Sequence, residues 1–361
     1  MTEPLLTVNH LRVAYGGGQA SASPAWAIDG ISFQLAAGER LGLVGESGCG
    51  KSTLGRAALR LLPPSARLEG QVRFGDRDVF ALRSEELRRF RGEAVALVFQ
   101  DPMTRLDPLM SIGEHCLETL QAHQPGLSRA QAKVKALETL AAVRIPAERW
   151  AQYPHEFSGG MRQRVAIALA LLLDPKLIVA DEPTTSLDVT VAAEILQELT
   201  RLCRERNLAL LLISHDLALV GEYCDRVAVM YQGKIVEIGA ARGLLARPQH
   251  DYTRSLLESA LHIHSLTTVS DRSSGAIAGL QPLLRLHQLE KHYSLEGNLL
   301  TQLLGRQSTP IKAVDGVSFE LYPGEIFGLV GESGCGKSTL SRTILQLIKP
   351  TGGKVEFDGS E

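Results

Sequence analysis

The sequence predicts an α/β fold that occurs twice in one chain of 361 residues. The first observation behind this prediction is the run GESGCGKST, which occurs at Gly45 to Thr53 and again, unchanged, at Gly331 to Thr339. The second is that an apolar, strand-like run precedes each copy and a helical pattern follows it. The third is the alternation of strand and helix patterns between Gly160 and Ser214, which is typical of a mainly parallel sheet.

A run of the form G-x-x-x-x-G-K-[ST] is a phosphate-binding loop when it lies between a strand and a helix. Strand patterns cover Arg40 to Val44 and Ile326 to Val330, and helical patterns begin at Leu54 and Leu340. The glycines let backbone N–H groups turn toward phosphate, the lysine reaches the outer phosphates, and the hydroxyl holds Mg²⁺. The residues predicted to bind nucleotide are Gly45, Ser47, Gly48, Cys49, Gly50, Lys51, Ser52 and Thr53 in the first phosphate loop, and Gly331, Ser333, Gly334, Cys335, Gly336, Lys337, Ser338 and Thr339 in the second, with Ser52 and Ser338 as metal ligands.

Composition indicates an ordinary globular chain, 44% apolar, with a formal net charge of −2. Because Lys and Arg are scattered rather than clustered, nucleic acid is not an expected partner. No apolar stretch approaches the roughly 18 residues that span a bilayer, and the start of the chain does not resemble a signal peptide. We therefore expect a cytosolic protein. The five cysteines indicate neither a disulfide framework nor a metal site.

The repeated unit is a whole domain. Ala27 to Leu61 and Ala313 to Leu347 align without gaps, with 24 identities over 35 positions. We place the first domain at residues 1–261, a Ser-, Thr- and Gly-rich linker at 262–282, and the second domain at 283–361. The second copy extends only 22 residues past its phosphate loop, so we expect a truncated tandem protein; the alternative is a chain that pairs with another chain.

Strand patterns at Leu6 to Val13 and Ile31 to Leu35, around a loop at Gly16 to Pro24, predict an antiparallel patch before the first phosphate loop. The elements expected later are helices at Ser84 to Arg91, Ile112 to Leu120, Ser128 to Val143, Gly160 to Leu173 and Val191 to Arg206, and strands at Ala94 to Phe99, Leu177 to Ala180, Ala209 to Ser214 and Lys354 to Phe357. Ser128 and Gln131 form a capping-box pattern. The stretch of about 101–156 is a helical insertion.

Two carboxylates, Asp181 and Glu182, end an apolar strand, at the edge where open α/β sheets bind ligands. Asp181 is suited to hold the Mg²⁺ shell, and Glu182 to orient and deprotonate the attacking water. His215 ends the strand at Ala209 to Ser214 and is a candidate contact for the γ-phosphate. Taken alone, the carboxylate pair fits a solvated acidic turn better than a catalytic site, and His215 fits a surface histidine.

The segment Phe157 to Arg164, FSGGMRQR, resembles the signature motif of ATP-binding cassette (ABC) ATPases, with Met161 where glutamine is frequent. The resemblance implies an ABC-type P-loop NTPase (RecA-like) core with an antiparallel β subdomain and a helical insertion, duplicated with an incomplete second copy. It implies ATP hydrolysis, with ATP and Mg²⁺ as cofactors. The roles it assigns are adenine stacking for Tyr15, the Q-loop for Gln100, the signature for Ser158, Gly159 and Gly160, the metal shell for Asp181 and Gln100, the D-loop for Ser186, Leu187 and Asp188, and catalysis for Glu182, His215 and Gln100.

In this family two modules close face to face, and the signature of one covers ATP on the phosphate loop of the other. A serine and two glycines that open a helix present N–H groups and the positive end of the helix dipole to an anion. The resemblance therefore implies pairing with a second ABC module, in the same chain or another. Ser158 would close over ATP at Lys337, whereas the signature that serves Lys51 would lie beyond Glu361.

Three stretches, Phe99 to Thr104, Tyr153 to Phe157 and a tail at about 245–261, are similar to the dipeptide and oligopeptide importer ATPases. Arg105 and Asp107 stand where that group usually has serine and asparagine. The resemblance implies peripheral attachment at the cytoplasmic face of the inner membrane, with two integral membrane permease subunits and an extracytoplasmic solute-binding protein as partners. The alternatives are a soluble tandem ATPase of translation or DNA repair, a drug exporter, and a regulatory ATP-binding half-protein.

Overall fold

The computed structural model describes residues 3–15, 25–101, 105–185, 187–261, 281–293, 310–331 and 334–360. It divides the chain into two compact units, Met1–Ser265 and Leu266–Glu361. The loop expected at Gly16 to Pro24, most of the expected linker, and the site residues Ser186 and Ser333 lie outside the described residues. None of the described helices combines the length and the apolar character needed to cross a bilayer.

The first unit begins with an antiparallel sheet of the order β2-β1-β4-β5 in its described part. Its strands are β1 (Leu6–Ala14), β2 (Trp26–Leu35), β4 (Arg67–Phe74) and β5 (Arg77–Asp78). Apolar residues alternate along β1, and Leu6, Val8, Leu11 and Val13 are all buried. The sheet therefore has one face toward a core, as the alternation in the sequence predicts.

The second sheet of this unit is mainly parallel, with the order β10-β9-β3-β8-β7-β6 among the described strands. Its strands are β3 (Arg40–Val44), β6 (Val95–Val98), β7 (Leu177–Asp181), β8 (Ala209–Ser214), β9 (Arg226–Tyr231) and the antiparallel edge strand β10 (Lys234–Ala240). Every residue of β7 and β8 is buried, because helices and the first sheet cover both faces. Leu211 and Ile213 pack into one core cluster, while Leu210 and Leu212 pack into the other.

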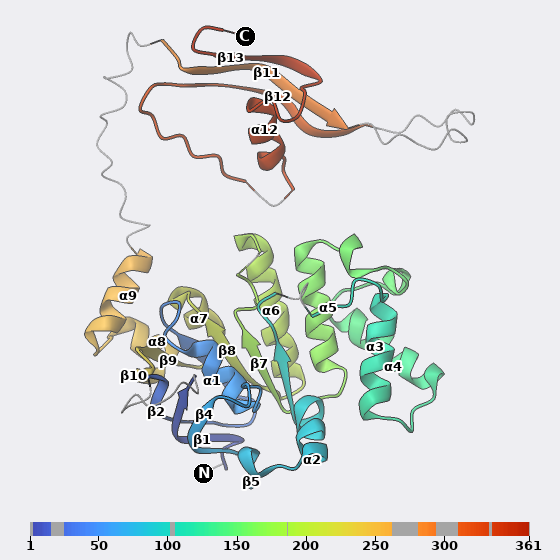
Figure 1. Cartoon of the computed structure of the whole chain (residues 1–361), viewed down its shortest axis with the longest axis vertical. Helices are drawn as coiled ribbons and strands as arrows, with labels where there is room; N and C mark the ends of the chain where they lie inside the picture. The colour runs from blue at the N-terminus through green and yellow to red at the C-terminus, as the bar shows by residue number, and fades with distance from the viewer. Residues whose placement is uncertain are drawn as a thin grey trace. The chain divides into compact units, whose positions relative to one another are not determined.

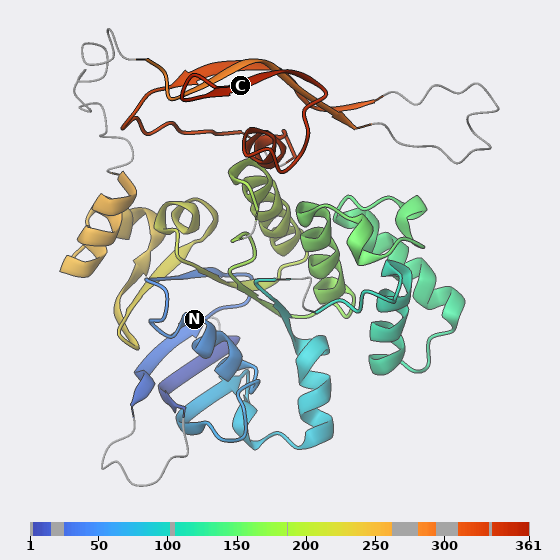
Figure 2. The ribbon, with the colours of Figure 1, turned by 45° about the horizontal axis from the view of Figure 1, so that its top comes forward.

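Helices surround this sheet, and a helical insertion adjoins one end of it (Figures 1 and 2). The helices are α1 (Lys51–Ala58), α2 (Ser84–Arg89), α3 (Ile112–His123), α4 (Arg129–Ala142), α5 (Gly159–Leu171), α6 (Val189–Glu205), α7 (Leu217–Tyr223), α8 (Ala241–Ala246) and α9 (Asp251–Leu261). Helices α3 and α4 form the insertion and contact each other and α5. The insertion thus packs on the helix that the signature opens.

Most expected elements of the first unit occur within a few residues of their predicted bounds. The capping box at the start of α4 is confirmed, because Gln131 N–H donates to Ser128 Oγ and Ser128 N–H donates to Gln131 Oε1. Helices α1 and α12 (Lys337–Ile344) begin three residues earlier than expected. Each follows a left-handed glycine, and its first turn belongs to the phosphate loop itself.

The described part of the second unit is a sheet of the order β12-β11-β13 with one helix, α12. Its strands are β11 (Leu284–Tyr293), β12 (Ile311–Leu321) and β13 (Gly352–Phe357). Leu284 pairs with Leu321 and Phe357, as Leu6 pairs with Leu35 and Phe74. The second unit therefore repeats the register of the first antiparallel sheet.

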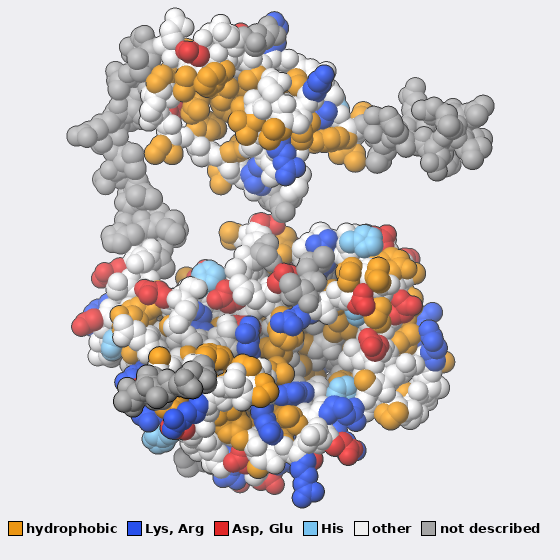
Figure 3. All heavy atoms as spheres, in the orientation of Figure 1, with side chains coloured by type: hydrophobic (Ala, Val, Ile, Leu, Met, Phe, Trp, Pro, Cys, Tyr) orange, Lys and Arg blue, Asp and Glu red, His pale blue; other side chains and the backbone are white. Residues whose placement is uncertain are grey.

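The prediction of a strand at Ile326 to Val330 is wrong for this structure. The segment is assigned to no strand, and Ile326 and Val330 are 99% and 92% exposed. Its counterpart β3 is hydrogen-bonded on both sides, by β8 and β9. Among the described residues 281–293, 310–331 and 334–360, no counterparts of these two strands occur, so this stretch of backbone has no neighbouring strand to bond with there. Figure 3 shows apolar side chains gathered on the visible face of this unit.

Candidate active site

Sheet register brings the candidate residues of the first unit together. Val44 at the end of β3 pairs with Ser214 at the end of β8, and Asp181 at the end of β7 pairs with Ile213. Because these strands are parallel, the segments that follow them leave the sheet at the same edge. The first phosphate loop, the Asp181-Glu182 pair and His215 are those segments.

Glycines set the path of the phosphate loop. Gly48 and Gly50 have φ angles of 84° and 104°, which L side chains rarely adopt. A Cβ at Gly50 would lie 2.5 Å from the carbonyl oxygen of Ala27, so the loop also passes too close to β2 for a side chain. The corresponding angles of Gly334 and Gly336 are 84° and 100°. The two phosphate loops therefore follow the same backbone path where both are described.

The lysine of each loop hydrogen-bonds to the backbone of that loop. Lys51 is 4% exposed, and its Nζ donates to the carbonyl oxygens of Gly45 and Glu46 at 2.8 and 2.9 Å. Lys337 Nζ donates to the carbonyl oxygen of Gly331 at 2.7 Å. A buried ammonium at the N-terminus of a helix is an electrostatic environment that attracts phosphate.

Ser52 and Asp181 meet beside the first loop, where Ser52 Oγ donates to Asp181 Oδ1 over 2.7 Å. Asp181 is 4% exposed, and its burial raises the pKa of the carboxyl group against the opposing effect of the Ser52 hydrogen bond. Mg²⁺ prefers few protein oxygen ligands and completes its shell with water and phosphate. The two oxygen atoms of Ser52 and Asp181 are suitable ligands for such an ion. Among the described residues, no group of three or more His, Cys, Asp or Glu forms a metal site with more protein ligands.

Glu182 is held in an uncommon backbone conformation, with φ at 48°. Its N–H donates to the carbonyl oxygen of Ile213 at 3.0 Å, and its Oε2 accepts from Thr185 Oγ1 at 2.8 Å. His215 Nδ1 lies 3.4 Å from the same Oε2. The sequence did not single out Thr185; its place three residues after the carboxylate, in the turn that follows β7, was the available signal.

Tyr15 and Gln100 lie at the margin of this arrangement. Tyr15 is 45% exposed, and its hydroxyl donates to Thr53 Oγ1 at 3.1 Å. The ring therefore lies near the first loop and is partly accessible to a stacking partner. Gln100 is exposed two residues after β6, which neighbours β7 in the sheet. Ser338 and Thr339 occupy the first turn of α12, as Ser52 and Thr53 do in α1.

The signature residues form a separate site. Ser158 caps α5 by accepting a hydrogen bond from Met161 N–H, and Gly159 follows it at the exposed helix start. A Cβ at Gly160 would lie 2.5 Å from Val191 Cγ1, so α6 packs closely on this glycine. Among the described residues, no hydrogen bond joins the signature to the first phosphate loop. The structure thus separates this anion-binding helix start from the Ser52 and Asp181 cluster.

The cysteines differ in exposure, which gives a testable prediction. Burial raises the pKa of Cys116, Cys203 and Cys224 to about 12, and burial also raises that of Cys49 against the effect of Lys51. Cys335 is exposed. Since the thiolate is the reactive form, we expect a maleimide at neutral pH to modify Cys335 in the native chain, and the other four only after unfolding. Peptide mass spectrometry measures this, and a native adduct at Cys49 would contradict it.

Comparisons with known proteins agree with this geometry. A family model described as ABC transporter matches residues 28–185 and 314–361. The glutathione import ATP-binding protein GsiA of Shigella dysenteriae is 39% identical over 382 residues, and that of Escherichia coli K12 is 38% identical. Each alignment covers 98% of this chain and 60% of the relative, so the chain spans about three fifths of the relatives' length.

Solved structures give the same fold. The ATP-binding cassette MJ0796, described as a dimer in a post-hydrolysis state with ADP and Pi, matches with a TM-score of 0.58 and 27% identity, covering 66% of this chain and 99% of that one. CbiO1 from Clostridium perfringens, part of the transporter complex cbiONQ, matches with a TM-score of 0.59 and 26% identity, covering 73% of this chain and 98% of that one. The expected P-loop NTPase core with an antiparallel sheet is therefore confirmed.

Proposed function

Because this chain belongs to the ABC transporter family, we propose that it binds and hydrolyses ATP to energise the import of peptides or related small solutes through separate membrane permease subunits. The observation that carries this proposal is the convergence of Lys51, Ser52, Asp181 and Glu182 at one sheet edge. A phosphate-binding loop, an oxygen pair for Mg²⁺ and a carboxylate for water are the parts that phosphoryl transfer to water requires.

Each residue has a role that follows from its place. Lys51 would exchange its carbonyl acceptors for phosphate oxygens, and Ser52 with Asp181 would hold Mg²⁺, which neutralises charge on the phosphates when bound. Glu182 would accept the proton of the attacking water while Thr185 keeps its carboxylate in position. His215, beside Glu182 and exposed, is placed to contact the γ-phosphate, and Gln100 to contact the metal or water.

Completion of the site requires a second module. The exposed helix start at Ser158 and Gly159 offers N–H groups to an anion. We propose that this anion is ATP bound outside the first phosphate loop, with which the signature shares no described hydrogen bond. ATP on the phosphate loop of a second ABC module, in the same chain or another, is the proposed counterpart of this signature. The repeated domain, residues 283–361, supports pairing within one tandem protein.

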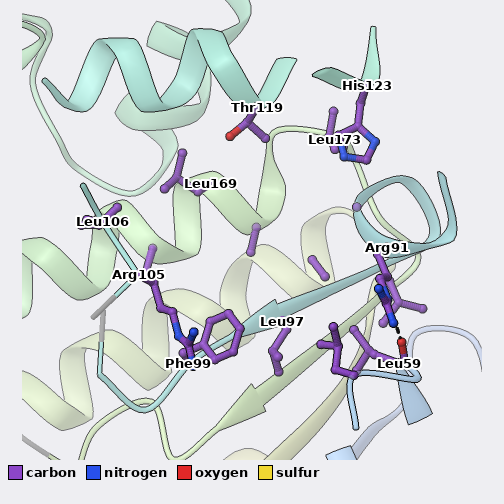
Figure 4. Close-up of a pocket in the computed structure, with 16 residues that line it drawn as sticks. Leu59, Arg91, Leu97, Phe99, Arg105, Leu106, Thr119, His123, Leu169 and Leu173 are labelled. Atoms are coloured by element: carbon purple, nitrogen blue, oxygen red, sulfur yellow. Dashed lines mark hydrogen bonds between the residues drawn. The ribbon is translucent and has the colours of Figure 1, made fainter. Parts of the chain in front are cut away.

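A hollow beside the insertion supports the proposed permease partner (Figure 4). It encloses about 300 Å³ between β6, α3 and α5, and its walls are mainly apolar, with Leu97, Leu169 and Leu173 among them. Arg105 lies at its side with the guanidinium 4.3 Å from the Phe99 ring centroid. A short helical segment of a permease with an apolar face is the occupant that this shape and composition fit.

A charged side chain introduced into this hollow tests whether the permease subunits bind there. We expect Leu169→Glu to abolish co-purification of the permease subunits while ATP binding stays within about twofold, because an unpaired carboxylate in an apolar contact is costly. The matched control is Val134→Glu, a charge on an exposed apolar residue of α4. Loss of the permeases from both variants, or from neither, would contradict docking in the hollow.

The function itself is tested by purifying the native protein from mildly solubilised cells and identifying its companions by mass spectrometry. The proposal expects two multispan permeases, attachment at the cytoplasmic face of the inner membrane, and dependence on an extracytoplasmic solute-binding protein. Peptides, glutathione among them, are the proposed solutes, since GsiA is named for glutathione import. If the protein is instead recovered with ribosomes or DNA and without membrane proteins, the proposed importer function is wrong and a soluble ATPase function is favoured.

A further inference from the structure

The tail helix α9 brings a tyrosine to the first phosphate loop. The hydroxyl oxygen of Tyr252 accepts a hydrogen bond from the backbone N–H of Glu46 at 3.0 Å. Glu46 is one of the two residues whose carbonyl oxygens receive Lys51. The tail, 206 residues away in sequence, therefore contacts the stretch of loop that positions the phosphate-binding lysine.

The Tyr252 ring is itself fixed in place. Its centroid lies 4.3 Å from that of Tyr231, at the end of β9. The turn after Tyr231 makes a second contact with the first phosphate loop, because Gly233 N–H donates to the carbonyl oxygen of Cys49 at 3.2 Å. Burial raises the pKa of the Tyr252 phenol, so the group stays neutral at physiological pH. Two contacts from outside the loop thus constrain it at Glu46 and at Cys49.

The start of the tail is anchored independently of the loop. The carboxylate of Glu237 on β10 accepts the backbone N–H groups of Gln249 and His250 at 2.9 and 3.1 Å. Burial opposes ionisation of Glu237, but these hydrogen bonds outweigh it and lower its pKa. Tyr252 N–H in turn donates to His250 Nδ1 at 3.1 Å. The tyrosine is therefore presented by a backbone whose position β10 determines.

We propose that Tyr252 is a positioning residue of the first phosphate loop, which holds the Glu46 backbone in the conformation that receives ATP without touching the nucleotide itself. The proposal rests on the function proposed above. A loop ordered before binding loses less conformational freedom when ATP arrives, so preorganisation increases affinity. The chemical step depends on Glu182 and the metal, so the turnover number should change much less than the affinity.

The test compares Tyr252→Phe, which keeps the ring and removes the hydroxyl, with Tyr231→Phe as a matched control. Tyr231 also carries a phenol in this ring pair, but its hydroxyl bonds only to the side chain of Gln232 among the described residues. The full chain carries Lys337→Ala in every case, so that a fluorescent ATP analogue reports the first loop. Hydrogen exchange of the peptide over residues 45–51 is followed without nucleotide.

Loss of one net hydrogen bond predicts that Tyr252→Phe weakens ATP binding about three- to tenfold. Exchange over residues 45–51 should be faster than in the parent, and Tyr231→Phe should match the parent. The turnover number, measured in chains that keep Lys337, should stay within about twofold. Unchanged affinity and exchange in Tyr252→Phe, with ATP binding intact in the parent, would overturn this inference alone. A parent chain that binds no ATP would overturn the proposed function together with it.

Discussion

Replacing Glu182 by glutamine is expected to lower ATP turnover by about 10²- to 10⁴-fold, the range for removal of a general base. Glutamine keeps the size of the side chain and an oxygen that can accept from Thr185. ATP binding should persist, because Lys51, Ser52 and Asp181 supply it and are untouched. The two measurements are steady-state phosphate release and equilibrium binding of a fluorescent ATP analogue.

The control for this prediction is Glu194→Gln, which removes an exposed carboxylate paired with Arg164 on the neighbouring helix. We expect its turnover to equal that of the parent, because Glu194 is 55% exposed and no described hydrogen bond or ion pair joins it to Lys51, Ser52, Asp181 or Glu182. Near-normal phosphate release by Glu182→Gln would exclude this carboxylate as the base. Loss of both binding and turnover would instead indicate that Glu182 shapes the nucleotide site.

The meeting of the residues around the first loop was predictable, because short, ordered motifs place them on parallel strands. The motifs identify a lysine and a serine in a glycine-rich loop and a carboxylate pair after an apolar strand. Because the strands before them are parallel, these residues meet at one edge of the sheet. Thr185 and Tyr252 were not predictable in these roles. Their contacts depend on side-chain directions and on a separation of 206 residues between Tyr252 and Glu46, which no local pattern encodes.

The two copies also show where local sequence stops determining structure. The segments Arg40 to Val44 and Ile326 to Val330 carry similar apolar patterns, but only the first is a strand. An apolar pattern makes a segment suitable for a strand. The segment becomes one only when neighbouring strands supply hydrogen-bond partners for its backbone. The phosphate loops themselves behave differently: Gly48 and Gly334 share a φ of 84°. Loop conformation is thus set by the local sequence, while the strand before it needs β8 and β9.

Replacing Gly50 by alanine is expected to abolish ATP binding at the first loop and to destabilise the first unit by about 3 kcal/mol or more. Its φ of 104° strains any L side chain, and the new Cβ would lie 2.5 Å from the carbonyl oxygen of Ala27. That oxygen belongs to β2, within a sheet, so it has little freedom to withdraw. The loop must therefore move, and the N–H groups that face phosphate move with it.

The comparison that isolates this effect is Gly75→Ala, in the turn between β4 and β5. Gly75 also has a positive φ, 58°, but a Cβ at this position would meet no other atom within 4 Å, so backbone strain alone should cost about 1 kcal/mol. Denaturant unfolding measures both variants, and ATP binding is then measured on the folded fraction. Every chain in this comparison carries Lys337→Ala, so that only the first loop binds ATP. If folded Gly50→Ala then keeps the parent's affinity, the phosphates are not held by the N–H groups of this loop.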